Sequence, residues 1–227
     1  MILEEIFPNL GVNHEVTSEN TQALQPWYPV VKGFRLNFVF SANQSDENSD
    51  SSSNSLDRII LKFIRSQSDL ILTSGKTARN ESLRSSTYAP LLIITNSDDQ
   101  FEIHAVTAQS KQSVYLTQRL GTLYPNSNAL AVGVFQGSPT KFAKSFCLSN
   151  SFHSVVLETG LSLTREFAED NQIHEVDLTV TKVQTREVAI EMANEFLVTI
   201  GIEQFSLLQL LRNSDSWFFR FEIPSTS

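Results

Sequence analysis

Two short polar turns carry the residue types that could hold a nucleotide, and each directly follows an apolar run. Residues 74–77 (Ser-Gly-Lys-Thr) follow the run at 70–72, and residues 158–162 (Glu-Thr-Gly-Leu-Ser) follow the run at 155–157. Where a buried strand passes through a glycine turn into a helix, free backbone amides suit an anion such as phosphate. Two such turns on parallel strands open at one sheet edge, where a dinucleotide can lie across them. By pattern alone, an ordinary connection is the more frequent meaning of each turn.

The tripeptide Gly-Lys-Thr at 75–77 also ends the phosphate-binding loop of many nucleoside triphosphatases. That loop needs a glycine five positions before Gly75, so that backbone amides can curl round the phosphates. Leu70 stands at that position, inside an apolar run. The spacing therefore argues against a nucleoside triphosphatase, and what remains is a strand, a polar turn and the start of a helix.

The histidines and the single cysteine form no recognisable centre. His14, His104, His153 and His174 are far apart and lack the spacing of metal ligands, so we expect no metal site. Cys147 lies between two apolar residues and is expected to be buried rather than nucleophilic.

Two helices are predicted to pack beside the turns. Leu56, Ile59, Ile60, Phe63 and Ile64 recur at the spacing of one helical stripe. Ser55 stands before this stripe as a plausible N-cap. A second helix is expected after the run at 155–157, because Leu163 and Phe167 are four residues apart.

Six runs have the composition of strands, the first of them at 35–40. The runs at 70–72, 91–94 and 155–157 are continuously apolar, which is typical of parallel strands covered on both faces. The runs at 176–180 and 217–223 alternate instead, which indicates antiparallel strands nearer an edge. Together with the helices they predict an α/β fold of three α-β-α layers, with a mainly parallel central sheet and antiparallel C-terminal strands.

Two segments fall outside this pattern. Residues 1–33 show no sustained period and contain three prolines, so we expect a leader packed on the domain. Residues 41–55 are rich in Ser, Asn and Asp, a composition that cannot bury itself, and a flexible loop is predicted there. The remainder, 34–227, is predicted to be one domain.

Bulk properties exclude several classes of protein. With 227 residues and 41% hydrophobic content, the chain can bury one sizeable core. Its formal charge of -8, with Lys and Arg scattered, argues against a nucleic-acid partner. No apolar stretch approaches the roughly 20 residues that span a bilayer, and the N-terminus lacks the features of a secretory signal. We therefore expect no membrane partner and a cytoplasmic location.

Three segments resemble the reductase half of the riboflavin-biosynthesis deaminase/reductase. Residues 68–81 (Ser-Asp-Leu-Ile-Leu-Thr-Ser-Gly-Lys-Thr-Ala-Arg-Asn-Glu) resemble that family's S-D-A-I-L-V-G-A-G-T-V-R-A-E. The second turn is similar to its V-E-G-G-P-T-L and continues at 173–176 as the family does through V-D-E-L. Residues 35–44 are similar to its first strand and S-L-D-G turn. The resemblance covers about 34–223 and is strongest to stand-alone actinobacterial-type pyrimidine reductases.

The resemblance implies a dihydrofolate-reductase-like fold, an NADPH cofactor and a homodimer. The implied reaction reduces the ribosyl group of a phosphoribosylamino-pyrimidine, 5-amino-6-(5-phosphoribosylamino)uracil, to a ribityl chain. Asn43 matches the position of the family's acidic residue, while Ser41 and Arg79 match substrate positions. The implied cofactor-binding residues are Ser74, Gly75, Lys76, Thr77, Glu158, Thr159, Gly160, Leu161 and Ser162.

The differences from the family concentrate in these same turns. Asn43 replaces an acid by an amide that cannot transfer a proton near pH 7. Lys76 and Thr159 replace glycines that let a backbone approach its ligand. The carboxylates of Asp46, Glu47 and Asp50 are alternative sources of the proton, although an acidic Ser-rich run is ordinarily solvated. Two functions therefore stand: an NADPH-dependent reductase, or a non-catalytic descendant that binds a nucleotide or a protein partner through the old cleft.

Overall fold

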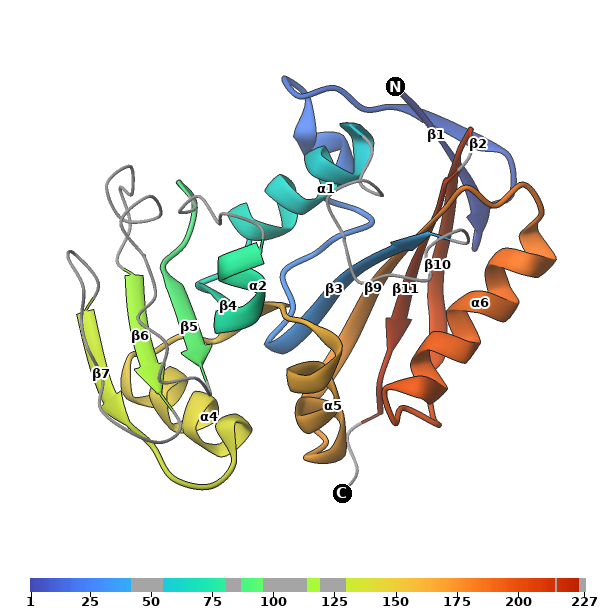
Figure 1. Ribbon diagram of the computed structural model, residues 1–227. Helices are drawn as coiled ribbons and strands as arrows, with labels where there is room; N and C mark the ends of the chain where they lie inside the picture. The colour runs from blue at the N-terminus through green and yellow to red at the C-terminus, as the bar shows by residue number, and fades with distance from the viewer. Residues whose placement is uncertain (42–54, 81–86, 96–113, 119–129, 215, 225–227) are drawn as a thin grey trace.

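The computed structural model describes residues 1–41, 55–80, 87–95, 114–118, 130–214 and 216–224 (Figure 1). Within these ranges, eleven strands form one mixed sheet. The elements are β1 (Ile2–Phe7), β2 (Val12–Glu15), η1 (Thr21–Leu24), β3 (Gly33–Ser41), α1 (Ser55–Ser66), β4 (Leu70–Ser74), α2 (Gly75–Asn80), β5 (Leu91–Thr95), β6 (Val114–Gln118), β7 (Leu130–Val134), α4 (Pro139–Ser149), β8 (Ser154–Glu158), α5 (Leu161–Glu169), β9 (Ile173–Thr181), α6 (Arg186–Thr199), β10 (Ser206–Asn213) and β11 (Ser216–Glu222). The strand order is β2-β1-β10-β11-β9-β3-β8-β4-β5-β6-β7.

The central strands are parallel, as the three continuous apolar runs predicted. β8 lies between β3 and β4, and β5 lies beyond β4. β6 and β7 extend this parallel set, although neither was identified from the sequence. Because parallel neighbours end at the same sheet edge, the turns that follow β4 and β8 share that edge.

The two alternating runs do not lie near an edge, contrary to expectation. β11 pairs antiparallel with β9 and β10, while β9 pairs parallel with β3 on its other side. β10, β1 and β2 continue the sheet beyond β11. Residues 1–33, expected as a leader, thus add two strands to the sheet. Their short length and the single apolar residue of β2 left no period to detect.

Helices cover both faces of the sheet, which confirms the predicted three layers. Leu70 and Leu72 of β4 belong to a core shared with α4, α5 and α6, whereas Ile71 belongs to a second core shared with α1 and the N-terminal segment. The predicted helices at 56–64 and 163–167 are α1 and α5. Figure 1 shows α1 crossing one side of the sheet, with α5 and α6 packed on the other.

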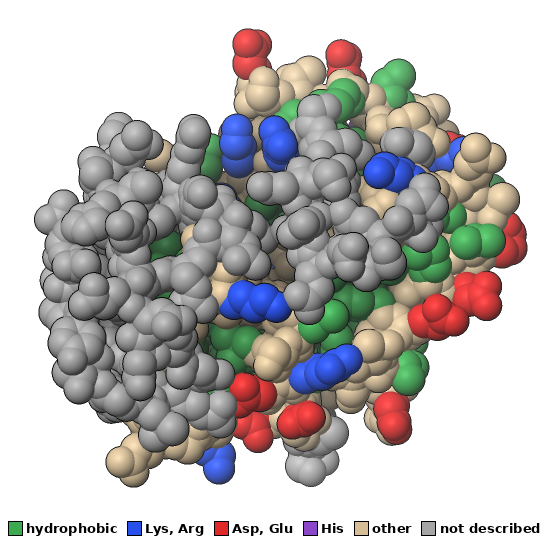
Figure 2. Space-filling view, viewed as in Figure 1, with side chains coloured by type: hydrophobic (Ala, Val, Ile, Leu, Met, Phe, Trp, Pro, Cys, Tyr) green, Lys and Arg blue, Asp and Glu red, His purple; other side chains and the backbone are tan. Residues whose placement is uncertain are grey.

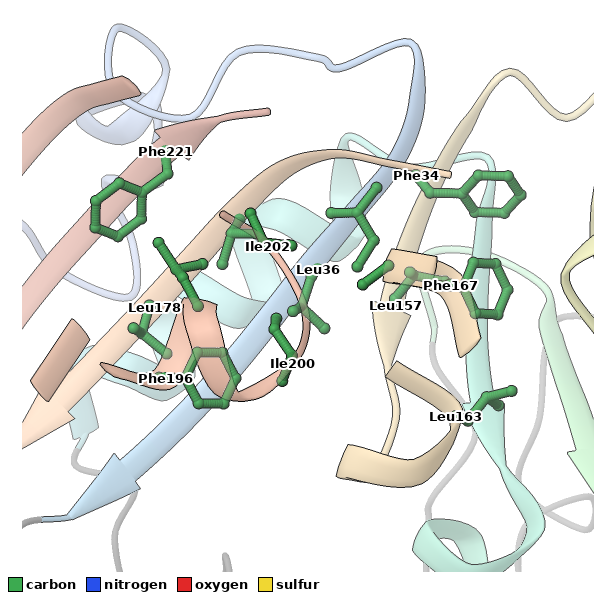
Figure 3. Close-up of a cluster of buried hydrophobic side chains, with 14 of the residues drawn as sticks. Phe34, Leu36, Leu157, Leu163, Phe167, Leu178, Phe196, Ile200, Ile202 and Phe221 are labelled. Atoms are coloured by element: carbon green, nitrogen blue, oxygen red, sulfur yellow. The ribbon is translucent and has the colours of Figure 1, made fainter. Parts of the chain in front are cut away.

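The larger core lies beneath α5 and α6 (Figure 3). Phe34 of β3 meets Phe167 of α5 with ring centroids 5.2 Å apart in a T-shaped arrangement. Leu178 of β9 and Phe196 of α6 close the core on the other side of the figure. Cys147, expected to be buried, is 5% exposed in this same core, and burial raises the pKa of its thiol to about 12.

The polar half of β9 is buried rather than solvated, which the alternating pattern did not predict. Arg35 donates hydrogen bonds to the Pro29 carbonyl at 2.7 Å and to Glu175 Oε1 at 2.6 Å. Arg220 donates to the Trp27 carbonyl at 3.1 Å and to Glu175 Oε2 at 2.9 Å. The N-terminal segment therefore covers this face and is tied to it through two guanidinium groups.

Asp177 completes this buried charge cluster. Its carboxylate is 3.3 Å from Arg35 Nε, and neither oxygen accepts a hydrogen bond from the described residues. Burial raises the pKa of Asp177 to about 7, against the lowering effect of Arg35, with Glu175 raising it further. The period of β9 predicted a strand correctly, but a pattern cannot report that residues far away in sequence exclude water from its polar face.

Surface charge is uneven on the face shown in Figure 2. Acidic side chains gather over α6, where Glu187, Glu191 and Glu195 are exposed at intervals of four residues. The Lys and Arg side chains visible on this face form no continuous stripe. No helix in the described ranges is both long enough and apolar enough to cross a bilayer.

Candidate cofactor and substrate site

The two glycine turns lie side by side at the carboxyl ends of β4 and β8. Thr73 and Glu158 are register partners, and Thr73 Oγ1 donates a 2.6 Å hydrogen bond to the Glu158 carbonyl. A Cβ atom added at Gly160 would meet Thr77 Oγ1 at 3.8 Å, an ordinary contact. The arrangement expected from the sequence, two turns sharing one edge, is therefore present.

The start of β4 explains why these strands are in register. Asp69 Oδ2 accepts hydrogen bonds from the backbone amides of His153 at 2.8 Å and Ser154 at 2.9 Å. The Asp69 backbone amide in turn donates to the Ser154 carbonyl at 2.7 Å. Asp69 thus fixes the amino end of β4 against β8, and the two turns at the opposite ends are placed together.

In the first turn, side chains form hydrogen bonds within the turn itself. Ser74 Oγ accepts from the Thr77 amide at 3.0 Å and lies 2.8 Å from Thr77 Oγ1. Gly75 is buried, and a Cβ added there would stand 2.6 Å from Thr95 Oγ1 and 2.7 Å from Thr95 Cβ. This glycine is required by packing against β5. Lys76 is exposed on the first turn of α2.

The second turn is more open. Thr159 is buried, with its hydroxyl 2.8 Å from that of Thr164. Gly160 is the N-cap of α5 and provides no side-chain hydrogen bond to the helix start. Leu161 is half-buried and Ser162 is exposed. This turn offers helix amides without a side-chain cap and a glycine with space beside it.

Glu158, assigned to the cofactor by resemblance, has a protein partner. Arg65, in the last turn of α1, donates from Nε to Glu158 Oε1 at 2.7 Å and from a terminal nitrogen to Oε2. Both side chains are largely buried, at 20% and 12% exposure. Sequence analysis missed Arg65, and its only signal was a basic residue on the polar side of the α1 stripe.

The residues assigned to the substrate are less completely placed. Ser41 is the last residue of β3, and its buried hydroxyl has no hydrogen-bond partner among the described residues. Arg79 belongs to α2, but its side chain lies outside the described part of the chain. Asn43 also lies outside it, as do residues 42–54 of the predicted loop. Ser55, expected as a cap, is the first residue of α1.

A carboxyl group that sequence analysis did not identify lies on the same face as Ser41. Asp57, in the first turn of α1, is 3% exposed and accepts a 2.9 Å hydrogen bond from Thr179 Oγ1. Burial raises the pKa of Asp57 to about 6, although the hydrogen bond from Thr179 and the charge of Arg58 lower it. The apolar stripe of α1 gave no sign that this neighbouring acid would be buried.

The second turn fits a dinucleotide cofactor better than the first. Beside Gly160 there is space that a ligand could enter, whereas the space beside Gly75 is filled by the side chain of Thr95. The amides at the start of α5 suit a phosphate, and exposed Lys76 is a cation on the neighbouring turn. Among the described residues, no three His, Cys, Asp or Glu side chains gather as a metal site.

This sheet order, its helix layers and its paired turns define a dihydrofolate-reductase-like fold, as the sequence predicted. A pyrimidine reductase-like protein of Corynebacterium diphtheriae shares it with a TM-score of 0.67 and 15% identity, over 93% of this chain and 100% of that one. The riboflavin biosynthesis reductase of Saccharomyces cerevisiae is similar with a TM-score of 0.62 and 11% identity, over 89% and 98%.

A bifunctional deaminase/reductase of Thermotoga maritima matches with a TM-score of 0.63 and 9% identity. That match covers 90% of this chain and 60% of the longer one. No protein-family model and no curated protein matches the sequence. The structural similarity establishes that this chain shares the fold of riboflavin-biosynthesis reductases.

Proposed function

We propose that this chain is an NADPH-dependent reductase that acts on a phosphoribosylamino-pyrimidine or a closely related sugar-linked heterocycle. One observation carries the proposal. Thr77 of the first turn lies beside Gly160 of the second, and Gly160 and the start of α5 remain open at the sheet edge shared by β4 and β8. When bound, the cofactor supplies the hydride. The protein supplies binding and orientation.

Each turn has a distinct part in binding the cofactor. Leu161 and Ser162 present backbone amides at the start of α5, where the helix dipole favours a phosphate. Lys76 adds a positive charge from α2 that can attract a further phosphate. Glu158 is held by Arg65, so we assign it to fixing the turn rather than to direct contact with the cofactor.

The substrate is assigned to the end of β3. The Ser41 hydroxyl is buried and has no partner among the described residues, so it can hydrogen-bond a polar group of the ligand. By resemblance, Arg79 binds the substrate phosphate and Asn43 orients the reacting sugar. These two assignments remain predictions.

The test is NADPH oxidation by the purified chain with 5-amino-6-(5-phosphoribosylamino)uracil. We expect substrate-dependent loss of NADPH absorbance. Asn43 cannot transfer a proton, so an increase in turnover of at least tenfold in Asn43→Asp, about 1.4 kcal/mol of barrier, would show that wild type has no other proton donor. Cofactor binding without substrate-dependent oxidation by either protein would contradict the reductase assignment.

That outcome would favour the second candidate, a non-catalytic descendant that binds a nucleotide or a partner. Two observations support it: Gly75 is used for packing against Thr95, and Glu158 is paired with Arg65. Both residues were assigned to the cofactor by resemblance. The two candidates separate on a single measurement, because only the reductase oxidises NADPH when the substrate is present.

A homodimer remains part of the proposal on resemblance alone, and a cytoplasmic location remains a prediction from the sequence. The runs at 176–180 and 217–223 were expected nearer an edge, but β9 and β11 lie inside the sheet and provide no free edge for pairing. Light scattering should give about twice the chain mass of 25.5 kDa at micromolar concentration. A mass near that of one chain would remove the dimer.

A further inference from the structure

Asp57 lies where the carboxyl ends of β3 and β9 meet the start of α1. Its partner Thr179 stands opposite Val39 in the parallel pairing, and the next pair on the same face is Ser41 with Thr181. Because alternate residues of a strand point to the same face, Asp57 packs on the face of the sheet that carries the Ser41 side chain, whose hydroxyl is buried and lacks a partner among the described residues.

Charged and polar groups from several elements around Asp57 interact with its carboxyl. Arg58 is its neighbour on α1, Glu158 approaches from the end of β8, and Thr179 binds it from β9. Tyr28 contributes from the N-terminal segment, and the negative charge of Asp57 raises the pKa of that phenol. Glu158 is the residue that begins the second glycine turn, so Asp57 interacts electrostatically with the cofactor side of the site.

We propose that Asp57 is the proton-transferring carboxyl of this site, in the role that Asn43 cannot perform. This inference rests on the proposed reductase function. Three observations carry it: the burial of Asp57, its hydrogen bond from Thr179 on the strand face that also carries Ser41, and its electrostatic interaction with Glu158 of the second turn. Proton donation at neutral pH requires a carboxyl that is kept partly neutral, and water exclusion provides that condition here.

The reduced bond is a C=N bond. The C=N bond of the ring-opened sugar gains a hydride at carbon and a proton at nitrogen, which yields an amine. The hydride, which carries the electron pair, comes from a dihydronicotinamide, and the oxidised nicotinamide is released. The proton comes from the Asp57 carboxyl, and the resulting carboxylate regains a proton from solvent.

The experiment compares wild type with Asp57→Asn, Thr179→Val and the exposed control Glu203→Gln. Asparagine keeps an oxygen that can accept from Thr179 but cannot donate a proton as an acid. We expect Asp57→Asn to lower turnover by about 10² to 10⁴, with NADPH affinity within about twofold of wild type. Glu203→Gln should match wild type in both. An Asp57→Asn protein that turns over at the wild-type rate overturns the inference.

The pH profile separates proton transfer from a structural role. Because the acid form is the donor, turnover should fall as pH rises through about 6, the pKa of Asp57. The Thr179 hydrogen bond lowers that pKa, so Thr179→Val should move the falling limb to higher pH. If turnover falls at the same pH in Thr179→Val as in wild type, Asp57 serves only to join α1 to β9.

A readout independent of turnover is the carbon-13 resonance of the Asp57 carboxyl, identified by its loss in Asp57→Asn. Bound NADPH excludes water and brings negative charge, so its addition should raise the midpoint of this titration. An unchanged midpoint in NADPH-saturated protein overturns the inference. If NADPH does not bind wild type, the proposed function and the inference both fail. If NADPH binds and shifts the midpoint without turnover, only the reductase assignment fails.

Discussion

The two turns at 74–77 and 158–162 have the same plan, yet their glycines do different work. Each follows a buried parallel strand and starts a helix. At Gly75, a side chain would run into Thr95 on the next strand. At Gly160, it would meet only Thr77, at an ordinary contact distance. A glycine in a strand-to-helix turn can therefore serve packing in one place and leave space for a ligand in the other.

The difference arises from the neighbour beyond each strand. β4 is followed in the sheet by β5, whose last residue, Thr95, stands against the first turn. β8 is flanked by β3 and β4, and the side of its turn faces Thr77. Substitutions at the two glycines should consequently separate stability from binding.

The largest expected effect is on stability at Gly75. Gly75→Ala should lower the free energy of unfolding by about 1 to 3 kcal/mol, the usual cost of overpacking, because Cβ of Thr95 is a part of that side chain that cannot rotate away. Chemical denaturation measures it. In a Thr95→Gly background the same substitution should cost less. An equal cost in both backgrounds would show that Thr95 is not the obstacle.

The ion pair at the second turn should have an effect on stability of similar size. Arg65→Met removes both hydrogen bonds to Glu158 and leaves a largely buried carboxylate without its guanidinium. We expect a loss of about 1 to 3 kcal/mol in stability, the range for hydrogen bonds to charged groups. Arg65→Lys should lose less, because charge is kept. Equal stability of Arg65→Met and wild type would mean that the turn does not need this pair.

The smallest expected effect is at Lys76. A lysine in place of the family's glycine can either attract a cofactor phosphate or block the cofactor, and the exposure of Lys76 favours attraction. Lys76→Gln should weaken NADPH binding by about 1 kcal/mol, roughly fivefold, as for an exposed charge pair. NADH binding should change less, since it lacks the 2'-phosphate. Stronger binding of NADPH to Lys76→Gln would restore the blocking interpretation.

The sequence predicted the elements with a clear period or a continuous apolar run. These were α1, α5 and the three central parallel strands. β10 was missed because Leu207, Leu208, Leu210 and Leu211 follow a spacing that also suits a helix, and its pairing contains a bulge. The place of β9 inside the sheet depended on strands from the opposite end of the chain.

The site was predictable only as far as the two turns. Their composition and order located Thr77 and Gly160, which the fold brings together. Arg65 and Asp57 were not found, because a polar residue on an amphipathic helix is ordinarily solvated. Their burial depends on contacts with Glu158 and Thr179, 93 and 122 residues away in sequence.

The central claim is that the second turn holds the cofactor, and Gly160→Ala tests it most directly. The added methyl group fits the folded chain, so the unfolding midpoint should fall only by the small difference between glycine and alanine as the N-cap of α5. It would also enter the space assigned to the cofactor, and fluorescence titration should show NADPH binding weakened at least tenfold, about 1.4 kcal/mol. Unchanged NADPH affinity in a normally folded Gly160→Ala protein would contradict the claim.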